Sequence, residues 1–259
     1  MIFIYLDELS KEIARLCSLI YSELSHKLSI VFDPISFVNY FMIYIEPTVL
    51  SDIVVIGVMP KFDVNVAVRL ANSFRAFSLE PKNLIINAES YVEVINLKTP
   101  GTDFFRNSKV VSAHNYVQLT YKTLETCFKY VLEDIKPSPR LELFQEDLES
   151  VRTLQRSDQV PESHLNSLLK IVESSNPILT TPSVNLFAKV LSFETKREVK
   201  EYIEFSKEKI FEYDILTTTS EEHWIKHLSR YAHIYVSLNV DPLIASYYLL
   251  KIYEILKQI

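Results

Sequence analysis

Two histidines four residues apart have the clearest spacing for chemistry in this chain. His223 and His227 lie in a stretch expected to be helical, and residues at i and i+4 share one face of a helix. Two imidazoles on one face can bind the same metal ion. However, Trp224 stands where the zinc-protease motif has its general-base glutamate, and no cysteine is near in sequence. Packing at the edge of an apolar face is therefore favoured over a metal site.

Five basic residues are candidates for contacts with DNA or RNA: Arg69, Arg75, Lys196, Lys200 and Lys207. The three lysines would form one stripe on a helix expected over residues 196–213, with a stripe of glutamates beside it. Close opposite charges weaken a field that attracts phosphates, so a solvated, salt-bridged face is favoured. The two arginines share an expected helix with two phenylalanines of its core-facing stripe, which favours packing over base stacking.

Glycine is scarce, and its scarcity excludes several kinds of site. The chain contains only Gly57 and Gly101. Loops that cradle phosphates need glycine so that backbone amides can approach the anion. A P-loop, a dinucleotide-binding fingerprint and the glycine-flanked elbow of α/β-hydrolases are therefore absent. Neighbouring carboxylates such as Glu221 and Glu222 diverge on a helix and do not predict an acid–base pair. The sequence predicts no catalytic residue and no cofactor.

The composition is that of a globular chain. Its 259 residues are 48% hydrophobic and 23% charged, with a net charge of -6 and no basic segment that would suggest duplex binding. Its two cysteines, Cys17 and Cys127, are expected to be free thiols in a reducing compartment. The bias toward Ile, Tyr, Lys and Glu fits a heat-adapted source or an AT-rich genome equally well.

The chain shows neither a signal peptide nor an apolar run long enough to cross a bilayer. The first six residues carry no positively charged side chain and are followed directly by Asp7 and Glu8, unlike a signal peptide. The longest uncharged apolar run covers only residues 34–45, too few to cross a bilayer as a helix. A cytoplasmic location with no membrane partner is therefore expected.

The first part of the chain, residues 1–98, is expected to form a small layered α+β unit. Its predicted order, α-β-β-α-β-β, rests on periodicity and turn signals. The expected helices are 7–28 and 63–77, and the expected strands are 52–59, 83–88 and 91–97. Residues 36–46 fit either a strand or a buried helix.

A turn at residues 99–102 is the expected boundary, and a helical bundle is expected over residues 99–259. Its predicted helices cover residues 113–136, 140–155, 161–174, 182–193, 196–213, 221–238 and 242–259. The predicted fold class is therefore α+β, predominantly α, with an N-terminal α/β unit followed by a C-terminal bundle.

The last expected helix is apolar around its whole circumference, which indicates burial on more than one side. Four of its residues are expected to face a protein partner or a second copy of the chain, with core packing as the alternative: Tyr247, Tyr248, Tyr253 and Ile255.

These features favour a non-enzymatic protein–protein interaction module, a subunit or adaptor of a larger cytoplasmic assembly. An accessory protein of nucleic-acid metabolism is the alternative, and a metal-dependent hydrolase using His223 and His227 is the second alternative.

Overall fold

The computed structural model divides into two compact units, Met1–Lys136 and Pro137–Ile259. It describes residues 1–44, 52–59, 63–77, 83–89, 91–92, 102–202 and 213–258. The division falls after the helix α5 (Tyr116–Glu133), not at the expected boundary of residues 98 and 99. The reason is that α5 packs against the first helix of the chain, α1 (Glu8–Ser25), and so belongs to the N-terminal unit.

A sheet of five parallel strands in the order β2-β1-β3-β4-β5 forms the centre of the N-terminal unit. The strands are β1 (Ile2–Tyr5), β2 (Ile30–Phe32), β3 (Ile53–Gly57), β4 (Asn83–Asn87) and β5 (Lys109–Val111). Every residue of β3 is buried. A parallel strand covered on both faces has a continuous apolar sequence, and this pattern supports the strand expected over residues 52–59.

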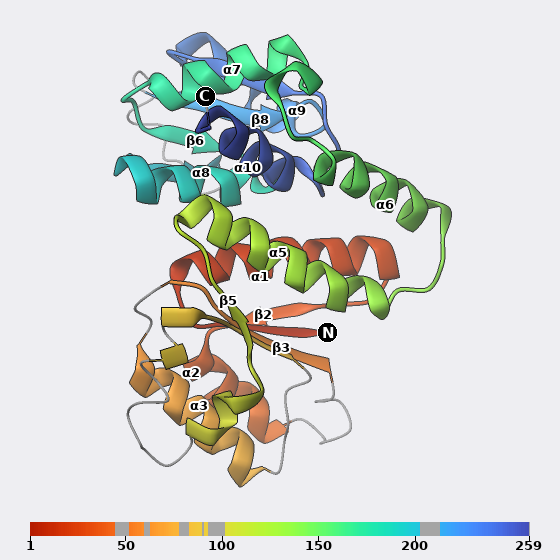
Figure 1. Cartoon of the computed structure of the whole chain (residues 1–259), viewed down its shortest axis with the longest axis vertical. Helices are drawn as coiled ribbons and strands as arrows, with labels where there is room; N and C mark the ends of the chain where they lie inside the picture. Colours follow the sequence, from red (N-terminus) through yellow and green to blue (C-terminus); the bar gives the residue numbers. More distant parts are fainter. Residues whose placement is uncertain are drawn as a thin grey trace. The chain divides into compact units, whose positions relative to one another are not determined.

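Helices cover both faces of this sheet. Figure 1 shows α1 and α5 on one face, with α2 (Pro34–Ser36) and α3 (Val64–Ala76) on the other. Residues 36–46, which fit either a strand or a helix in the sequence, are helical as far as the structure describes them. Helix α2 continues into a π-helix, Phe37–Phe41, and a 3-10 helix, Met42–Tyr44. A further 3-10 helix covers Thr102–Asn107. The strand expected over residues 91–97 is described only at Tyr91 and Val92, which are helical.

The C-terminal unit is also a parallel α/β layer structure. Its sheet of four parallel strands has the order β7-β6-β8-β9. The strands are β6 (Ile178–Thr180), β7 (Val199–Glu201), β8 (Asp214–Thr218) and β9 (Tyr235–Leu238). The helices are α6 (Pro139–Arg152), α7 (Glu162–Glu173), α8 (Pro182–Thr195), α9 (Glu222–Ile225) and α10 (Ala245–Leu256), with 3-10 helices at Ser157–Gln159 and Lys226–Tyr231.

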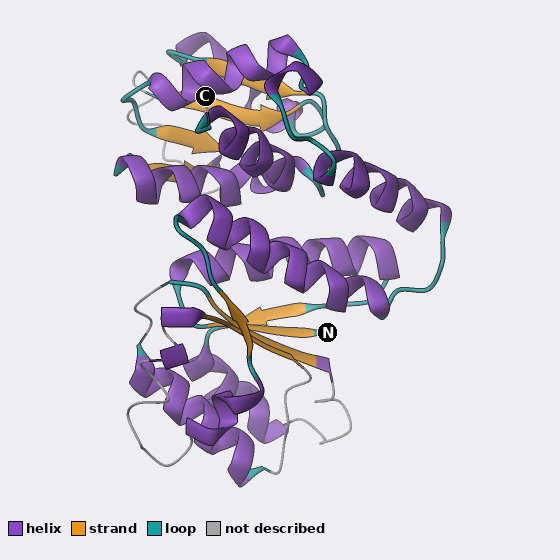
Figure 2. Cartoon of the chain, in the orientation of Figure 1, coloured by secondary structure: helices purple, strands orange, loops and turns teal. Residues whose placement is uncertain are grey.

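The expected helical bundle is wrong. Strand β7 lies inside the helix predicted over residues 196–213, and β9 lies inside the helix predicted over residues 221–238. Strand β7 contains only three residues, and β9 alternates between half-buried and buried residues over only four, which is too short a run to distinguish a strand from part of a helix. Figure 2 shows the strands of this unit lying between helices.

The two faces of the C-terminal sheet are covered by different helices. Helix α8 contacts the sheet on one face and packs against α10. On the other face, Leu179 and Ile215 pack against Ile225 and Leu228 of α9 and the following 3-10 helix. Within the described residues, no helix has both the length and the apolarity needed to cross a bilayer.

Strand order reverses at one point in each sheet. Strand β1 lies between β2 and β3, and β6 lies between β7 and β8. The connections that follow β1 and β6 therefore leave toward opposite faces of the sheet from those that follow β3 and β8. In open parallel sheets this reversal leaves a crevice at the carboxyl ends of the two strands, where ligands bind. The pairs β1–β3 and β6–β8 therefore mark the two candidate ligand positions.

Candidate functional site

Hydroxyl groups gather where β6 and β8 end. We call this set the hydroxyl cluster: Thr180, Thr181, Ser183, Thr217, Thr218, Thr219 and Ser220. All but Thr219 and Ser220 are fully buried. Hydroxyls both donate and accept hydrogen bonds, so the cluster can adapt to a polar ligand.

The carboxylate of Glu221 lies among these hydroxyls and is 8% exposed. It accepts a hydrogen bond from the Ser183 hydroxyl, one of 3.4 Å from the Ser183 amide and one of 3.3 Å from Thr218 Oγ1. Ser183 lies in the first turn of α8. The backbone amides of a first turn have no partner within the helix and form the positive end of its dipole. Glu221 therefore occupies a position built to hold an anion.

Polar side chains continue from this point toward β7. The Asn185 amide nitrogen donates to Glu201 Oε1 at 2.7 Å, and its oxygen accepts from Thr180 Oγ1 at 3.0 Å. These contacts extend from the end of β6 to the end of β7.

Further polar contacts continue in the opposite direction, toward β9. Thr181 Oγ1 donates to Thr217 Oγ1 at 3.1 Å, and Thr219 Oγ1 donates to Asn239 Oδ1 at 3.2 Å. Hydrogen-bonding groups thus follow the carboxyl ends of all four strands.

The corresponding place in the N-terminal unit, between β1 and β3, is filled by Asp7. Its Oδ1 accepts from the Ser10 amide at 2.8 Å, while Oδ2 accepts from the amides of Val58 at 2.7 Å and Met59 at 3.2 Å. Burial raises the pKa of Asp7, although these hydrogen bonds act in the opposite direction. The carboxylate joins the end of β1 to the end of β3.

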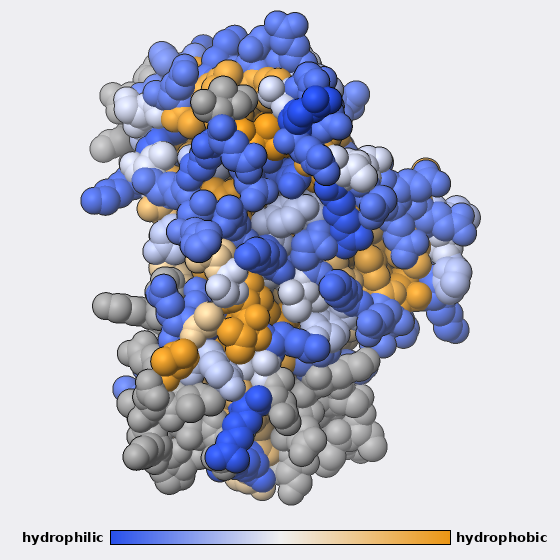
Figure 3. Space-filling model, in the orientation of Figure 1, coloured by the Kyte–Doolittle hydropathy of each residue, from blue (hydrophilic) through white to orange (hydrophobic). Residues whose placement is uncertain are grey.

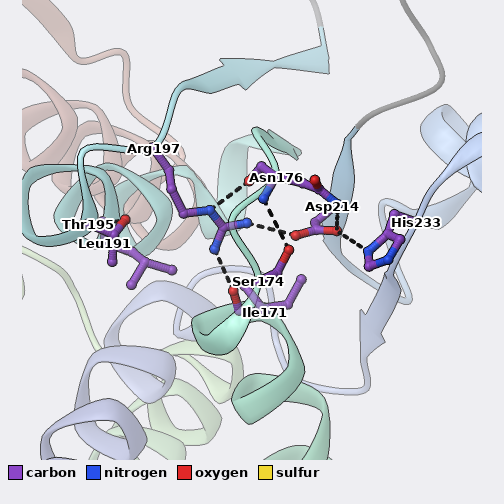
Figure 4. A network of polar contacts seen from close by, with 8 residues as sticks. All are labelled: Ile171, Ser174, Asn176, Leu191, Thr195, Arg197, Asp214 and His233. Carbon is purple, nitrogen blue, oxygen red and sulfur yellow. Dashed lines mark hydrogen bonds and ion pairs between the residues drawn. The ribbon is translucent and has the colours of Figure 1, made fainter.

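The amino edge of the C-terminal sheet carries a separate polar network, drawn in Figure 4. Arg197 Nη2 lies 2.7 Å from Asp214 Oδ2, and His233 Nδ1 lies 3.3 Å from the other oxygen of Asp214. Arg197 Nε donates to the carbonyl of Asn176 at 2.6 Å. Asn176, Arg197 and His233 precede β6, β7 and β9, and Asp214 begins β8, so the network joins the four amino ends. Parallel sheets bind ligands at the other edge.

The four residues expected to face a partner are buried in the C-terminal unit. Tyr247, Tyr248, Tyr253 and Ile255 are 0%, 8%, 5% and 4% exposed. Tyr248 OH lies 2.8 Å from His164 Nδ1, and burial raises the pKa of Tyr248 to about 12. The Tyr253 ring packs edge-on against Phe187, with centroids 5.9 Å apart. In Figure 3 the visible face of this unit is mostly hydrophilic, with small apolar patches between the polar side chains.

The two histidines with metal-ligand spacing lie on different helical segments. His223 belongs to α9 and contacts Trp224, whereas His227 belongs to the 3-10 helix that follows and contacts Tyr202. The predicted continuous helix is thus broken between them. Within the described parts of the chain, no three His, Cys, Asp or Glu side chains form a group that could hold a metal ion.

The three lysines are not placed on one helix. Lys196 ends α8 in a left-handed conformation with φ 58°, whereas Lys200 lies on β7. Lys200 Nζ is 3.0 Å from Glu198 Oε1 and 3.1 Å from Tyr213 OH. Lys207 lies outside the described residues. The stripe was predicted on a helix over residues 196–213, and strand β7 lies within that range.

The two arginines lie on the exposed part of α3. Arg69 lines a pocket of about 90 Å³ between α2 and α3, together with Pro34, Ile35, Val38, Asn39, Val66 and Leu70. This volume is well below that of a typical ligand pocket. Contacts of Arg69 or Arg75 with a nucleic acid remain a prediction.

Solved structures with the same fold were found, although the sequence matches no known family model and no curated protein. Tagatose-6-phosphate ketose/aldose isomerase from Escherichia coli has a TM-score of 0.53 and 11% identity, covering 99% of this chain and 81% of that one. The C-terminal domain of glucosamine-fructose-6-phosphate aminotransferase from Francisella tularensis has a TM-score of 0.58 and 9% identity, covering 98% and 83%. A candidate phosphosugar isomerase from Clostridium difficile 630 has a TM-score of 0.59 and 12% identity, covering 98% and 81%.

These structures correct two expectations. The shared fold has parallel sheets, which replaces the predicted C-terminal helical bundle. The neighbours are described as phosphosugar isomerases and as a domain of an aminotransferase named for fructose 6-phosphate. These descriptions overturn the expectation of a non-enzymatic interaction module. At these identities the likeness concerns the fold, and the chain has a parallel α/β fold similar to that of phosphosugar isomerase structures.

Proposed function

We propose that the C-terminal unit binds a phosphorylated sugar at the carboxyl ends of β6 and β8. The observation that carries this proposal is the convergence of the Ser183 amide, the Ser183 hydroxyl and Thr218 Oγ1 on one anionic group, the Glu221 carboxylate. A phosphate group needs the same donors, because helix N-termini and hydroxyls bind its oxygens without requiring a glycine-rich loop. The neighbouring folds, described as acting on phosphosugars, support the same ligand class.

The sugar part of the ligand would lie toward β7. There the Asn185 amide can donate hydrogen bonds to a polyol and accept them from it, and the Glu201 carboxylate can accept them. Glu201 is partly exposed, so a ligand can reach it from solvent.

Glu201 also supports a second candidate function, aldose–ketose isomerisation of the bound sugar. This reaction needs a base that takes a proton from one carbon and returns it to the adjacent carbon. Asn185 holds the Glu201 carboxylate in place through a 2.7 Å hydrogen bond. The expected signature is deuterium from D2O appearing in fructose 6-phosphate by NMR, and its loss in Glu201→Gln. Incorporation that persists in Glu201→Gln would exclude Glu201 as the base.

The binding proposal is tested by calorimetric titration with fructose 6-phosphate and glucosamine 6-phosphate, each compared with the unphosphorylated sugar. Ser183→Ala is expected to weaken binding of the phosphorylated sugars about tenfold, the effect of losing one hydrogen bond to a charged group. Ser150→Ala is the matched control, because its exposed hydroxyl bonds only the Glu146 carbonyl within its own helix. The absence of saturable binding by the wild type to any phosphorylated sugar tested would refute the proposal.

A further inference from the structure

Each unit places one of its own carboxylates at the point where its strand order reverses. Asp7 does so between β1 and β3, and Glu221 does so between β6 and β8. Each carboxylate accepts a backbone amide from the first turn of a helix that follows the central strand: Ser10 in α1 and Ser183 in α8. The two units therefore fill equivalent positions with a negative charge of the chain itself.

The two carboxylates are held differently. Asp7 is the N-cap residue of α1 and accepts three backbone amides, which cannot turn away. The Ser10 hydroxyl in turn accepts from the Asp7 amide at 2.9 Å, which completes a capping box. Removal of this carboxylate would remove the side-chain cap of α1 and the hydrogen bonds that join Asp7 to the amides at the end of β3.

Glu221 is held by fewer fixed groups. It reaches α8 from the segment after β8, and its contact with a backbone amide is long, at 3.4 Å. Its other donors, the hydroxyls of Ser183 and Thr218, can rotate toward a different acceptor. Ser183 itself is not the N-cap of α8, which is Thr181. Thr181 makes no capping hydrogen bond through its side chain, so departure of the Glu221 side chain leaves the Ser183 amide open to an entering anion.

We infer that Glu221 is a displaceable internal occupant of the anion position in the C-terminal unit, and that Asp7 closes the equivalent position in the N-terminal unit permanently. The inference rests on the proposed function and deepens it. A carboxylate and a phosphate repel each other at hydrogen-bond distances, so they cannot share the donors of Ser183 and Thr218. A ligand phosphate enters only when Glu221 leaves, which selects against weakly bound anions. Each chain would then bind one phosphorylated ligand.

The test compares the full chain with its Glu221→Ala and Glu221→Gln variants, titrated with inorganic phosphate and with fructose 6-phosphate. Removing the occupant is expected to tighten binding of both ligands about tenfold in Glu221→Ala, because no charge has to be displaced. The isosteric Glu221→Gln removes only the charge, and tighter binding is expected there also. Glu173→Ala is the control for net charge, because Glu173 is exposed on α7 and its removal should leave both affinities unchanged. The expected stoichiometry is one ligand per chain.

The outcomes separate the two proposals. If the wild type binds fructose 6-phosphate and both Glu221 variants bind it equally or more weakly, Glu221 is a ligand-binding group and the inference fails, while the proposed function stands. If neither the wild type nor any folded variant binds a phosphorylated ligand, the proposed function fails and the inference fails with it. Two ligands per chain would refute the closure by Asp7. Thermal unfolding curves establish that each variant is folded.

Discussion

Arg197 and Asp214 form a buried ion pair at the amino edge of the C-terminal sheet, with Arg197 Nη2 2.7 Å from Asp214 Oδ2 and side-chain exposures of 4% and 0%. The other two guanidinium nitrogens, Nε and Nη1, donate to the backbone carbonyls of Asn176 and Ile171 (Figure 4). Burial lowers the pKa of Arg197, while Asp214 acts to raise it. The proposed ligand site lies at the carboxyl edge of the same sheet. One edge thus holds the strands together through a buried ion pair, and the other carries the proposed ligand site.

Loss of Arg197 should destabilise the C-terminal unit strongly. Arg197→Met would leave Asp214 buried without its cation, and breaking one side of a buried pair costs about 3–5 kcal/mol of unfolding free energy. Urea denaturation measures the change. The exposed pair of Arg156 and Asp158, 3.4 Å apart, gives the control: Arg156→Met should cost less than about 1 kcal/mol. Equal effects of the two substitutions would show that the buried pair carries no special stability.

Ionisation of the buried Tyr248 hydroxyl should lower the free energy of unfolding at alkaline pH. Burial raises the pKa of Tyr248 to about 12, above the value of about 10 for a free tyrosine. The folded state therefore binds more protons between these values, so this contribution is complete below pH 10 and is lost as pH rises toward 12. The loss amounts to about 2.5 kcal/mol when both states are ionised. Urea unfolding between pH 8 and 11 should show a shallower decline in Tyr248→Phe, and identical declines would contradict the assignment.

The thiols of Cys17 and Cys127 should be unreactive in the folded protein. They are 0% and 1% exposed, on the adjacent helices α1 and α5. Two causes raise the pKa of the Cys127 thiol well above its usual value: the larger is its hydrogen bond with Cys17, and the second is burial. Because the thiolate is the nucleophile, iodoacetamide at neutral pH should label neither cysteine until urea unfolds the chain. Mass spectrometry counts the labels, and rapid labelling of the native protein would contradict this expectation.

Helices were predictable from the sequence where they are long and end with clear capping residues. The helix expected over residues 63–77 is α3, and Asp63 caps it: its Oδ1 accepts from the amides of Asn65 at 2.9 Å and Val66 at 3.3 Å. Helix α5 follows the apolar repeat over residues 113–136 closely. Such helices bury one stripe, and the 3.6-residue period of that stripe is visible in the sequence.

The C-terminal strands were missed because they contain three to five residues and lie between two layers of helices. Neither alternation nor length distinguishes such strands from parts of a buried helix. One signal was present: the run Ile-Leu-Thr-Thr occurs at residues 178–181 and again at 215–218. Both copies mark a buried strand that ends in hydroxyl groups.

The candidate site itself could not be predicted, because its partners are distant in sequence. Ser183 and Glu221 are 38 positions apart and meet only because β6 and β8 are neighbours in the sheet. In the helix expected over residues 221–238, the side chains of Glu221 and Glu222 would point in different directions, so the sequence did not mark Glu221 as a site residue. Its contacts follow from the order of parallel strands, which residue spacing does not specify.

The two carboxylate oxygens of Asp7 accept hydrogen bonds from different parts of the N-terminal unit. Oδ1 accepts the Ser10 amide, and Oδ2 accepts the amides of Val58 and Met59. Asparagine caps helices as well as aspartate does, but its Nδ2 cannot accept a hydrogen bond. Asp7→Asn should therefore leave donors at the end of β3 unpaired and cost about 1–3 kcal/mol of unfolding free energy in urea titrations.

Asp63 offers the matched comparison, because a single oxygen of its exposed carboxylate accepts both amides of the α3 cap. Asparagine can reproduce that arrangement, so Asp63→Asn should change stability by less than about 0.5 kcal/mol. A large difference between the two substitutions would establish that Asp7 does more than cap a helix and that it joins β1 to β3. Equal small effects would show that the amides of Val58 and Met59 find other acceptors, and the closure of the N-terminal switch point by Asp7 would then be untenable.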